Sequence, residues 1–316
     1  MPSRKGCDVP ITPTAKIWMD GELVDWEQAT VHVLTHSLHY GSAVFEGIRA
    51  YATPTGPAVF RLRAHIDRLL RSAHVLELTV PYGADELCSA VRETVRASGI
   101  AACYIRPLVY LGYGEMGLNP LPCTVHVAIA VWPWGAYLGE MEGDAGIRLK
   151  VSSWARHDPR AVPSAAKATG FYINSSLAKV EAVRAGYDEA LLCTTDGYLA
   201  EGTGENLFVV RDGVIATPPA SAVGALEGIT AASVATLAAD LGYEVREKLM
   251  RRADLYVADE AFLTGTAAEV VPIASVDDKA VGSGRRGPVT AAIQEAFFGV
   301  VRGENDRYKD WLDHVD

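Results

Sequence analysis

The spacing of apolar residues in the first half of the chain predicts a mixture of short strands and helices. Ile17-Trp18-Met19 and Leu23-Val24 are strand-like runs, and the Asp20-Gly21 dipeptide between them is typical of a tight turn. Further strands are predicted at residues 58–60, 104–111 and 124–132. Between them, apolar residues at helical spacing predict two helices, with buried positions Ile66, Leu69, Leu70 and Ala73 in one and Leu87, Val91 and Val95 in the other.

The second half of the chain combines strands and helices without strict alternation. Strands are predicted at residues 147–154, 189–193, 207–210, 243–247 and 261–264, and helices at 172–185, 229–241 and 288–301. Asp196-Gly197 and Asp212-Gly213 are typical of hairpin turns. Because the strands do not alternate regularly with helices, the pattern argues against a simple doubly wound parallel sheet.

A change of composition divides the chain. Residues 135–146 contain four glycines and several acidic residues but show little periodicity, which is typical of a connection between domains. A length of 316 residues also favours two domains. We therefore expect a small N-terminal domain at residues 1–135, a connection at 136–148 and a larger domain at 149–316.

Charge and cysteine content narrow the class of protein. The formal net charge of −10 disfavours nucleic acid and anionic membrane surfaces as partners, because both attract clustered Lys and Arg. The scattered cysteines, with no C-x-x-C pair, indicate a reducing compartment. Residues 1–13 have no apolar segment typical of a signal peptide, and no apolar run is long enough to span a bilayer. We expect a cytoplasmic protein that binds small molecules.

Two other motifs are interpreted as structural. Residues 282–287 match G-x-G-x-x-G, but polar residues precede them and Pro288 follows, so we expect a surface turn rather than a dinucleotide site. His32, His36 and His39 have no cysteine nearby to complete a zinc site, so we expect no metal there. The chain also lacks a Walker-type phosphate loop and a G-x-S-x-G nucleophile elbow.

One lysine stands apart from the other seven. Lys167 lies in the segment 163–170 (PSAAKATG), among small uncharged side chains, whereas most lysines have charged neighbours. A partly desolvated amine can act as a nucleophile. A solvated lysine beside a loop would show the same local pattern, so this segment alone leaves both interpretations open.

Three further motifs favour the nucleophile. Residues 199–206 (LAEGTGEN) place acidic residues in a glycine-rich turn before a strand, where a carboxylate could keep a pyridine nitrogen protonated. Gly228-Ile229-Thr230 opens a predicted helix, whose free N–H groups would suit a phosphate. Gly265-Thr266 follows a predicted strand and offers a second set of N–H groups. Together these motifs supply an imine-forming amine, an electron-sink partner and a phosphate anchor.

At this point the chain resembles the fold-type IV (class IV) aminotransferases, and most closely the bacterial branched-chain amino acid aminotransferases. The resemblance runs from about residue 17 to residue 311. The stretches that carry it are 36–41 (HSLHYG), 44–49 (VFEGIR), 104–108 (YIRPL), 116–120 (MGLNP), 133–139 (PWGAYLG), 163–170, 201–208 (EGTGENLF) and 265–269 (GTAAE).

The resemblance implies a fold, a cofactor and a set of cofactor contacts. The fold is a two-domain α/β (α+β) structure, with a small N-terminal domain and a larger C-terminal domain that has a pseudo-barrel β core. The cofactor is pyridoxal 5′-phosphate. Lys167 forms the Schiff base, Glu201 pairs with the pyridinium nitrogen and Tyr172 contacts the phenolic oxygen. The phosphate is held by Arg68 and by the backbone of Gly228, Ile229, Thr230, Gly265 and Thr266.

The resemblance also implies the substrate contacts. Tyr104 and the backbone of Thr266 and Ala267 receive the α-carboxylate, and Arg106 meets the side-chain carboxylate of glutamate. The apolar side chain lies against Phe45, Gly47, Trp134 and Tyr137, with Tyr40 and Leu118 reaching in from a second subunit. Three positions depart from the usual pattern: Leu118 stands where valine is common, Glu227 where proline is common, and Ala231-Ala232 where Arg-Asp is common.

The function implied is reversible amino transfer between leucine, isoleucine or valine and 2-oxoglutarate, in a homodimer that could assemble further. Alternatives within the fold are a D-amino acid aminotransferase, an (R)-amine transaminase and an aminodeoxychorismate lyase, and the motifs around Tyr104 and Met116 favour the branched-chain enzyme. Outside the class, a non-catalytic metabolite-binding homologue is disfavoured by the intact Lys167, and an NAD-linked dehydrogenase by the context of residues 282–287.

Overall fold

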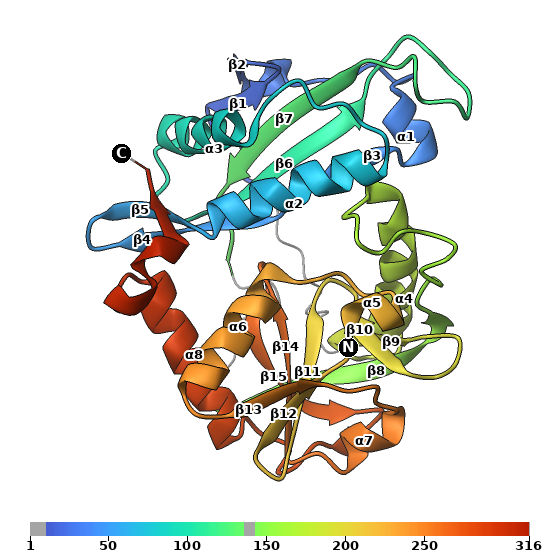
Figure 1. Ribbon diagram of the computed structural model, residues 1–316, viewed down its shortest axis with the longest axis vertical. Coiled ribbons are helices and arrows are strands. Elements are labelled where there is room, and N and C mark those ends of the chain that lie inside the picture. Colours follow the sequence, from blue (N-terminus) through green and yellow to red (C-terminus); the bar gives the residue numbers. More distant parts are fainter. Residues whose placement is uncertain (1–10, 136–142, 316) are drawn as a thin grey trace, which may run out of the picture. The chain divides into compact units, whose positions relative to one another are not determined.

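The computed structural model describes residues 11–135 and 143–315. The chain forms two compact units. Of the described residues, the first unit, called here the sheet unit, comprises 11–134, 166–172 and 299–315, and the second, the barrel unit, comprises 135, 143–165 and 173–298. Figure 1 shows the elements of both. Most of the connection expected at 136–148 lies outside the described residues.

The sheet unit is built on antiparallel strands. Within the described residues, eight strands pair in the order β17-β5-β4-β6-β7-β1-β2, with β3 also paired to β6. The strands are β1 (Lys16–Met19), β2 (Glu22–Asp25), β3 (Ala43–Phe45), β4 (Ile48–Thr53), β5 (Gly56–Phe60), β6 (Cys103–Leu111), β7 (Val125–Trp132) and β17 (Leu312–His314). Its helices are α1 (His36–Tyr40), α2 (Leu62–Val75) and α3 (Ala84–Ser98), with 3-10 turns η1 (Trp26–Gln28), η2 (Thr169–Phe171) and η3 (Asp306–Trp311).

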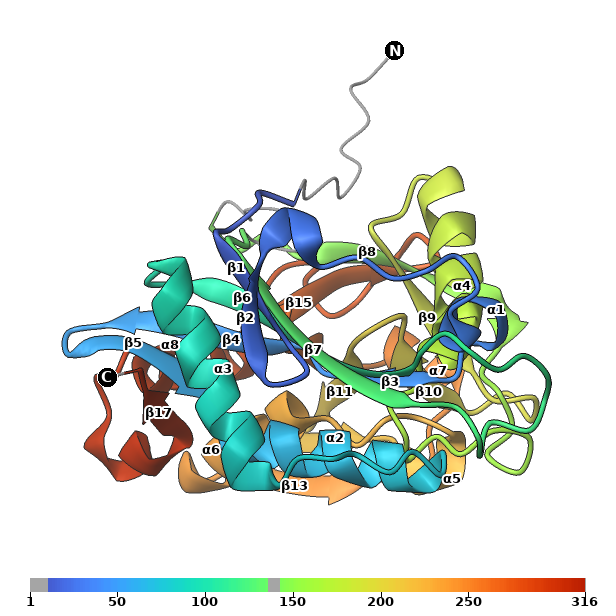
Figure 2. The same ribbon diagram turned by 90° about the horizontal axis from the view of Figure 1, so that it is seen from above.

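The two predicted helices of this unit, α2 and α3, are confirmed. The N-terminus of α3 is stabilised by Glu86, whose carboxylate accepts the Gly83 N–H at 2.7 Å. The helix ends at Gly99, which adopts φ +67°, a left-handed conformation that costs glycine little. α3 packs on β7 and β1, whereas α2 packs on β6 and on α3 (Figure 2).

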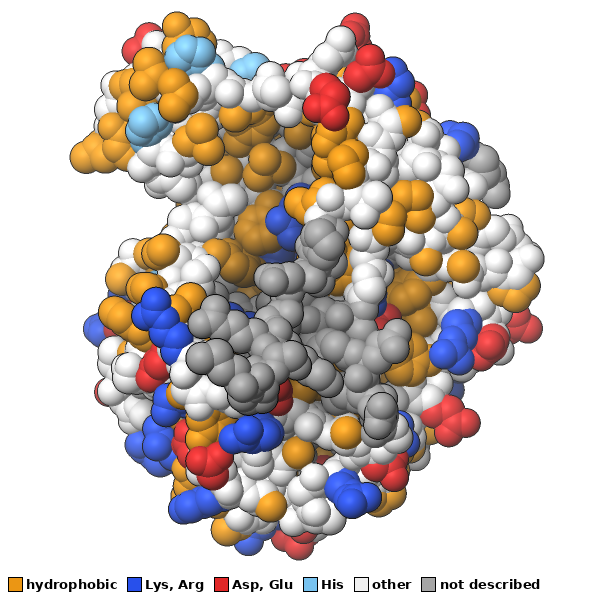
Figure 3. Space-filling view, turned by 180° about the vertical axis from the view of Figure 1, so that it is seen from behind, with side chains coloured by type: hydrophobic (Ala, Val, Ile, Leu, Met, Phe, Trp, Pro, Cys, Tyr) orange, Lys and Arg blue, Asp and Glu red, His pale blue; other side chains and the backbone are white. Residues whose placement is uncertain are grey.

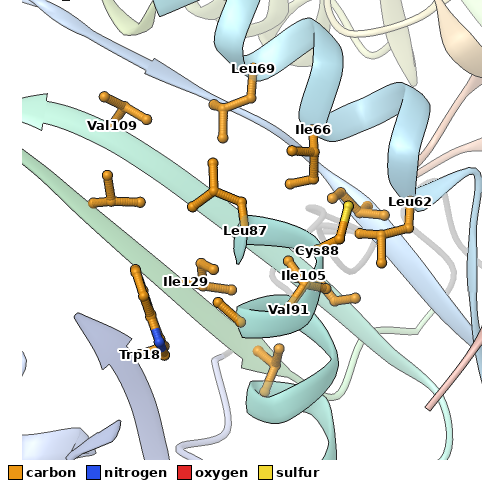
Figure 4. Packing of buried hydrophobic residues seen from close by; sticks show 14 of the residues in the cluster. Trp18, Leu62, Ile66, Leu69, Leu87, Cys88, Val91, Ile105, Val109 and Ile129 are labelled. Carbon is orange, nitrogen blue, oxygen red and sulfur yellow. The ribbon is translucent and has the colours of Figure 1, made fainter. Parts of the chain in front are cut away.

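The apolar residues of α2 and α3 bury their side chains against one face of the sheet. Figure 4 shows this packing, in which Leu62, Ile66 and Leu69 of α2 and Leu87 and Val91 of α3 meet Ile105, Val109 and Ile129 of the strands. Because side chains alternate along a strand, the neighbours of Ile105 on β6, Tyr104 and Arg106, lie on the opposite face. The sheet therefore has an apolar face and a face that carries aromatic and charged residues.

The barrel unit is organised around a closed sheet. Among the described strands, β10 pairs with β9 and also with β11, so that β8, β9, β10, β11, β14 and β15 form a ring. The strands are β8 (Ile147–Ala155), β9 (Glu189–Cys193), β10 (Leu199–Gly202), β11 (Asn206–Arg211), β12 (Val214–Thr217), β13 (Glu244–Glu247), β14 (Glu260–Gly265), β15 (Glu269–Val276) and β16 (Lys279–Ala280). This closure confirms the predicted barrel-like β core.

Helices accompany the strands of the barrel unit, and its interior is apolar. The helices are α4 (Tyr172–Arg184), α5 (Ala220–Val223), α6 (Ile229–Asp240), α7 (Arg252–Tyr256) and α8 (Pro288–Val301). Leu149, Leu191, Leu207, Leu263 and Ile273 come from five different strands and form one buried cluster. None of the helices in the described ranges is long and apolar enough to cross a membrane.

Two features of the barrel unit show how the sequence directs the backbone. The predicted Asp212-Gly213 hairpin joins β11 to β12, and both residues have positive φ, as a two-residue turn requires. Strand β15 was not predicted because Pro272 interrupts its apolar run, although Pro272 pairs with Phe262 within the sheet.

The G-x-G-x-x-G match at residues 282–287 forms a turn, as expected. The helix after it is already capped by Glu260, which accepts the Val289 and Thr290 N–H groups.

Candidate active site

Lys167 is held in the sheet unit by contacts on its amine and on its backbone. Its Nζ donates to the Tyr172 hydroxyl at 2.6 Å and lies 5.0 Å from the centre of the Phe45 ring. Its backbone N–H donates to Ser72 Oγ at 3.0 Å, and its carbonyl accepts the Phe45 N–H at 3.1 Å. The adjacent Ala166 and Ala168 are buried. The structure thus brings Lys167, Tyr172 and Phe45 together.

A buried polar cluster occupies one face of α2. His65, Arg68 and Ser72 recur at helical spacing and are all buried. The Glu46 carboxylate accepts Arg68 Nε at 2.6 Å, Arg68 Nη2 at 2.9 Å and His65 Nδ1 at 2.8 Å. Arg68 was predicted as a phosphate contact, whereas Glu46 and His65 were not assigned roles. A polar stripe at positions 65, 68 and 72 between apolar positions was the sequence signal that could have identified His65.

The charges in this cluster are set by burial and pairing. Burial by itself would raise the pKa of Glu46, but Arg68 and His65 outweigh it and hold this pKa well below its usual range. Burial lowers the pKa of His65, against the attraction of Glu46. The pKa of Arg68 is raised because Glu46 more than offsets the effect of burial. At neutral pH the cluster therefore consists of a carboxylate, a guanidinium and a neutral imidazole.

Aromatic side chains surround Arg106 on the face of the sheet opposite the apolar core. The Arg106 guanidinium carbon lies 4.8 Å from the ring centre of Phe45, 5.4 Å from that of Tyr104 and 5.8 Å from that of Trp132. Trp134 stacks on Tyr104 at 4.8 Å between ring centres. The Nε of Arg106 is buried and has no hydrogen-bond partner among the described residues. This arrangement offers apolar contact and a cation in one place.

Gly47 is required by the position of Tyr104. A Cβ atom at residue 47 would collide with the Tyr104 hydroxyl group. The absence of a side chain at Gly47 therefore lets the phenol of Tyr104 approach the backbone that follows β3. Tyr137, the remaining residue expected to line the side-chain pocket of this subunit, lies outside the described residues.

The two residues expected to reach a second subunit are exposed. Tyr40 on α1 is 43% exposed, and Leu118 in the loop between β6 and β7 is 87% exposed. His36 joins these segments, since its ring nitrogens bond to Ser42 Oγ and to the Gly117 carbonyl. Figure 3 shows exposed hydrophobic side chains beside histidines in this part of the sheet unit, which is called here the apolar lobe. Its other exposed hydrophobic residues are Val31, Val33, Leu34, Leu38, Tyr113, Met116 and Leu121.

In the barrel unit, Glu201 lies on β10 in a buried ion pair. Its Oε1 lies 2.9 Å from Arg156 Nη2, and its Oε2 accepts the Leu226 N–H at 3.1 Å. Arg156 is itself oriented by the Gly224 carbonyl, to which its Nε donates at 2.9 Å. Arg156 was missed from the sequence, because it lies 45 residues from Glu201 in a segment without a motif. A guanidinium at this distance favours the charged form of a carboxyl group, which is the form that the predicted role of Glu201 requires.

Two further buried acidic residues of the barrel unit lie at the start of β9 and in the glycine-rich turn, respectively. Glu189 is fully buried and accepts Lys179 Nζ at 2.6 Å and Thr203 Oγ1 at 2.7 Å. Glu205 is also buried, and its carboxyl accepts the Gly204 N–H at 3.1 Å. Burial, together with the charge of Glu189, raises the pKa of Glu205 to about 8. Glu205 therefore carries a proton at neutral pH.

The predicted phosphate-binding backbone also lies in the barrel unit. Gly228 precedes α6 and provides no side-chain cap, so the first N–H groups of α6, at Ile229 and Thr230, have no side-chain acceptor from that position. A Cβ atom at Gly228 would collide with Asn206 Oδ1. Gly265 ends β14, and Thr266 and Ala267 form the turn before β15. Glu227, whose charge would weaken an anion site, is exposed.

These features fit pyridoxal 5′-phosphate. An amine beside a phenol suits an aldehyde next to a hydroxyl group, and a buried glutamate paired with a guanidinium suits a protonated pyridine nitrogen. An uncapped helix N-terminus suits a phosphate. In addition, Thr264 Oγ1 on β14 is buried without a partner among the described residues, so this region contains an unsatisfied polar group. The described residues, among them His32, His36 and His39, contain no group of three or more His, Cys, Asp or Glu side chains that could hold a metal ion.

The fold and these residues define an aminotransferase of class IV. The family model described as amino-transferase class IV matches residues 43–276, which is most of the chain. The protein therefore belongs to the class IV aminotransferase family.

The curated relatives are more specific. The chain is 51% identical over 295 residues to the branched-chain-amino-acid aminotransferase of Pseudomonas aeruginosa, covering 93% of this chain and 95% of that protein. It is 50% identical over 300 residues to the enzyme of the same name from Escherichia coli, covering 95% of this chain and 97% of that protein.

Solved structures agree in fold. The branched-chain aminotransferase of Thermoproteus uzoniensis with norvaline matches with a TM-score of 0.91 and 47% identity, over 96% of this chain and 100% of that one. The structure of the Escherichia coli enzyme matches with a TM-score of 0.93 and 49% identity, over 96% of this chain and 100% of that one. A further branched-chain amino acid aminotransferase, solved with pyridoxamine 5′-phosphate, matches with a TM-score of 0.94 and 49% identity, over 97% of this chain and 100% of that one. The expected fold-type IV architecture is confirmed.

Proposed function

We propose that this protein is a branched-chain amino acid aminotransferase that uses pyridoxal 5′-phosphate. It transfers the amino group reversibly between leucine, isoleucine or valine and 2-oxoglutarate. The observation that carries the proposal is the setting of Phe45, because the Lys167 amine and the Arg106 guanidinium both lie within 5.0 Å of the centre of this one ring. An apolar surface, a nucleophilic amine and a carboxylate-binding cation are thereby combined, as an enzyme that accepts both leucine and glutamate requires.

In this proposal, separate groups of residues hold each part of the cofactor. Lys167 binds its aldehyde, Tyr172 its phenolic oxygen and Glu201 its ring nitrogen. The phosphate is bound by Arg68 and by the backbone of Gly228, Ile229, Thr230, Gly265 and Thr266. When bound, the cofactor supplies an aldehyde for the substrate amine and a ring that withdraws electrons from the α-carbon.

Lys167 also moves the proton. Its Nζ is the atom that takes the α-proton of the amino acid and later returns it. The hydrogen bond to Tyr172 fixes the amine in position before the transfer. Glu201 would keep the ring nitrogen protonated, and Arg156, 2.9 Å from its Oε1, orients the Glu201 carboxylate. Proton transfer and charge stabilisation are thus assigned to different side chains.

One pocket receives both kinds of substrate. Phe45, Gly47 and Trp134 contact the apolar side chain, whereas Arg106 binds the side-chain carboxylate of glutamate or 2-oxoglutarate. Tyr104 and the backbone of Thr266 and Ala267 bind the α-carboxylate. Planar guanidinium groups match carboxylates with two parallel hydrogen bonds, which gives Arg106 its selectivity.

The proposal includes a homodimer as the minimal unit, in the cytoplasm. Tyr40 and Leu118 would complete the pocket of the second subunit, and their exposure in an apolar lobe supports this. Monomeric proteins rarely expose a large contiguous apolar patch. No nucleic acid or membrane partner is expected from a chain with a net charge of −10.

Borohydride labelling and a substrate panel test the proposal. The purified protein should be yellow, and borohydride should fix the cofactor to the peptide that contains Lys167. Lys167→Ala should abolish turnover yet still bind cofactor through its phosphate. With 2-oxoglutarate as acceptor, L-leucine, L-isoleucine and L-valine should react, whereas D-amino acids and (R)-amines should not. A label on another peptide, or a preference for D-amino acids, would remove the proposed assignment.

A further inference from the structure

The carboxylate of Glu46 is used by none of the steps described above, yet it is among the most completely buried charged groups of the sheet unit. It follows β3 directly, and its backbone N–H donates to the Pro107 carbonyl at 2.9 Å. An isolated carboxylate in such a place would be strongly destabilising. Three donors from two α2 side chains offset this cost, so Glu46 and α2 are fixed to each other.

The contact between Glu46 and Arg68 is directional. Both carboxylate oxygens are engaged, with Oε1 on Arg68 Nε at 2.6 Å and Oε2 on Arg68 Nη2 at 2.9 Å. Two parallel bonds between planar groups define the plane and the rotation of the guanidinium as well as its location. Because a guanidinium has five N–H donors, a carboxylate on this edge is compatible with a second anion on another edge.

His65 fixes the Glu46 carboxylate. Its Nδ1 bonds to Glu46 Oε2 at 2.8 Å, so Oε2 is held by His65 and Arg68 together. Both residues lie on α2, and Ser72 on the same helix accepts the backbone N–H of Lys167 at 3.0 Å. Through this one face, the helix that presents Arg68 is tied both to Glu46 and to the segment that carries the amine.

We propose that Glu46 is a positioning residue, which orients the Arg68 guanidinium for the phosphate of the cofactor. This inference rests on the proposed function. Orienting the Arg68 guanidinium is a different role from only neutralising its charge. If Glu46 only neutralised Arg68, removing its charge would leave a stronger cation and tighten phosphate binding. If Glu46 orients Arg68, removing it should weaken phosphate binding although the site becomes more positive.

The experiment compares pyridoxal 5′-phosphate with pyridoxal, which lacks the phosphate. Binding to Lys167 is followed by absorbance titration of the cofactor-free protein and by borohydride fixation, so the measurement does not depend on turnover. In Glu46→Gln, one acceptor oxygen becomes an NH₂ group that faces the guanidinium. The affinity for pyridoxal 5′-phosphate should fall about ten- to a hundredfold, as for loss of one charge-assisted interaction. The affinity for pyridoxal should be nearly unchanged.

Two further variants separate positioning from folding. Glu46→Asp keeps the charge but withdraws the carboxylate by one methylene group, so it should also lose the preference for the phosphate-bearing compound. In an Arg68→Met background, Glu46→Gln should cause no additional loss of that preference, because Glu46 acts through Arg68. Circular dichroism and urea unfolding establish that each variant is folded.

Glu260→Gln is the matched control. Glu260 is a buried carboxylate with three donors, Val289 N–H, Thr290 N–H and Thr290 Oγ1, and it belongs to the barrel unit. It should alter stability without changing the ratio of the two affinities. Equal losses for both compounds in Glu46→Gln, or tighter binding of pyridoxal 5′-phosphate, would overturn the inference. If the wild-type protein forms no adduct at Lys167, the proposed function fails instead.

Discussion

Two buried glutamates, one in each unit, have pKa values that their surroundings shift in opposite directions. Glu46 in the sheet unit has Arg68 and His65 as partners, and they hold its pKa well below the usual range in spite of burial. Glu205 in the barrel unit accepts the Gly204 N–H, and no described Lys or Arg forms an ion pair with it. Burial and the nearby Glu189 raise the pKa of Glu205 to about 8.

The difference shows that burial alone does not determine the charge of a carboxyl group. Burial disfavours the charged form at both sites, and a guanidinium within hydrogen-bonding distance reverses the outcome at one of them. The two groups therefore affect stability in opposite pH ranges. The contribution of Glu46 is present above its unfolded-state pKa and is lost on acidification. That of Glu205 is present below its unfolded-state pKa and is lost as the pH rises toward 8.

The largest loss of stability is expected from removing Arg68, the cation that pairs with Glu46 and has no counterpart at Glu205. Arg68→Met leaves Glu46 buried with only His65, and breaking a buried ion pair in this way typically costs about 3–5 kcal/mol of unfolding free energy. Urea unfolding of the cofactor-free protein at neutral pH measures it. The variant should also regain stability on mild acidification, because His65 or Glu46 can then take up a proton.

A surface pair provides the control for Arg68→Met. Arg92 and Asp313 form an ion pair at 2.8 Å in which both side chains are about one-third exposed. Arg92→Met should cost no more than about 1 kcal/mol, as is typical of exposed pairs. If the two substitutions prove equally destabilising, the contrast drawn between Glu46 and Glu205 would lose its basis.

A smaller and pH-dependent effect is expected at Glu205. Glu205→Gln keeps the shape of the protonated acid but cannot ionise. The wild-type protein should lose stability relative to the variant between about pH 4.5 and pH 8, because its folded-state pKa is raised from 4.5 to about 8. The difference at pH 9 should be on the order of a few kcal/mol. Urea unfolding of both proteins at several pH values would show it, and parallel stability curves would mean that Glu205 does not titrate in this range.

The smallest effect is expected at Arg106, a cation placed among aromatic rings rather than beside a carboxylate. Arg106→Met should impair the half-reaction with glutamate or 2-oxoglutarate far more than the half-reaction with leucine. The loss of one charge-assisted pair corresponds to roughly 1.5–3 kcal/mol, or about ten- to a hundredfold. Single-turnover spectra with each substrate alone measure the two half-reactions separately.

An alternative role of Arg106 would give a different pattern. If the guanidinium only packs against Phe45, Tyr104 and Trp132, its loss should affect both half-reactions equally. Equal losses would assign Arg106 to the structure of the sheet and would leave the carboxylate of glutamate without a partner in the proposed pocket.

Much of the fold could be predicted because local patterns agree with the tertiary structure. The helices α2, α3, α4, α6 and α8 lie close to their predicted ranges, and the Asp20-Gly21 turn joins the two expected strands β1 and β2. Strand β15 was missed, since Pro272 breaks its pattern, and its place between β14 and β8 could not be seen from the local sequence. Strands β3 and β4 were missed as well. The three residues of β3 are all buried and show no alternation, whereas β4 does alternate between buried and less buried positions and was overlooked.

The sequence by itself predicted most of the helices and many of the strands, and it singled out Lys167 and, through a resemblance, the other candidate site residues. Only the tertiary structure decided which charges meet. Glu46 and Arg68 are 22 residues apart, and the contact of Glu201 with Arg156 spans 45 residues. Periodicity reports on neighbours three or four positions away in a helix and two in a strand. The partner of a buried charge depends instead on the pairing of distant strands and on helix packing, which no local pattern contains.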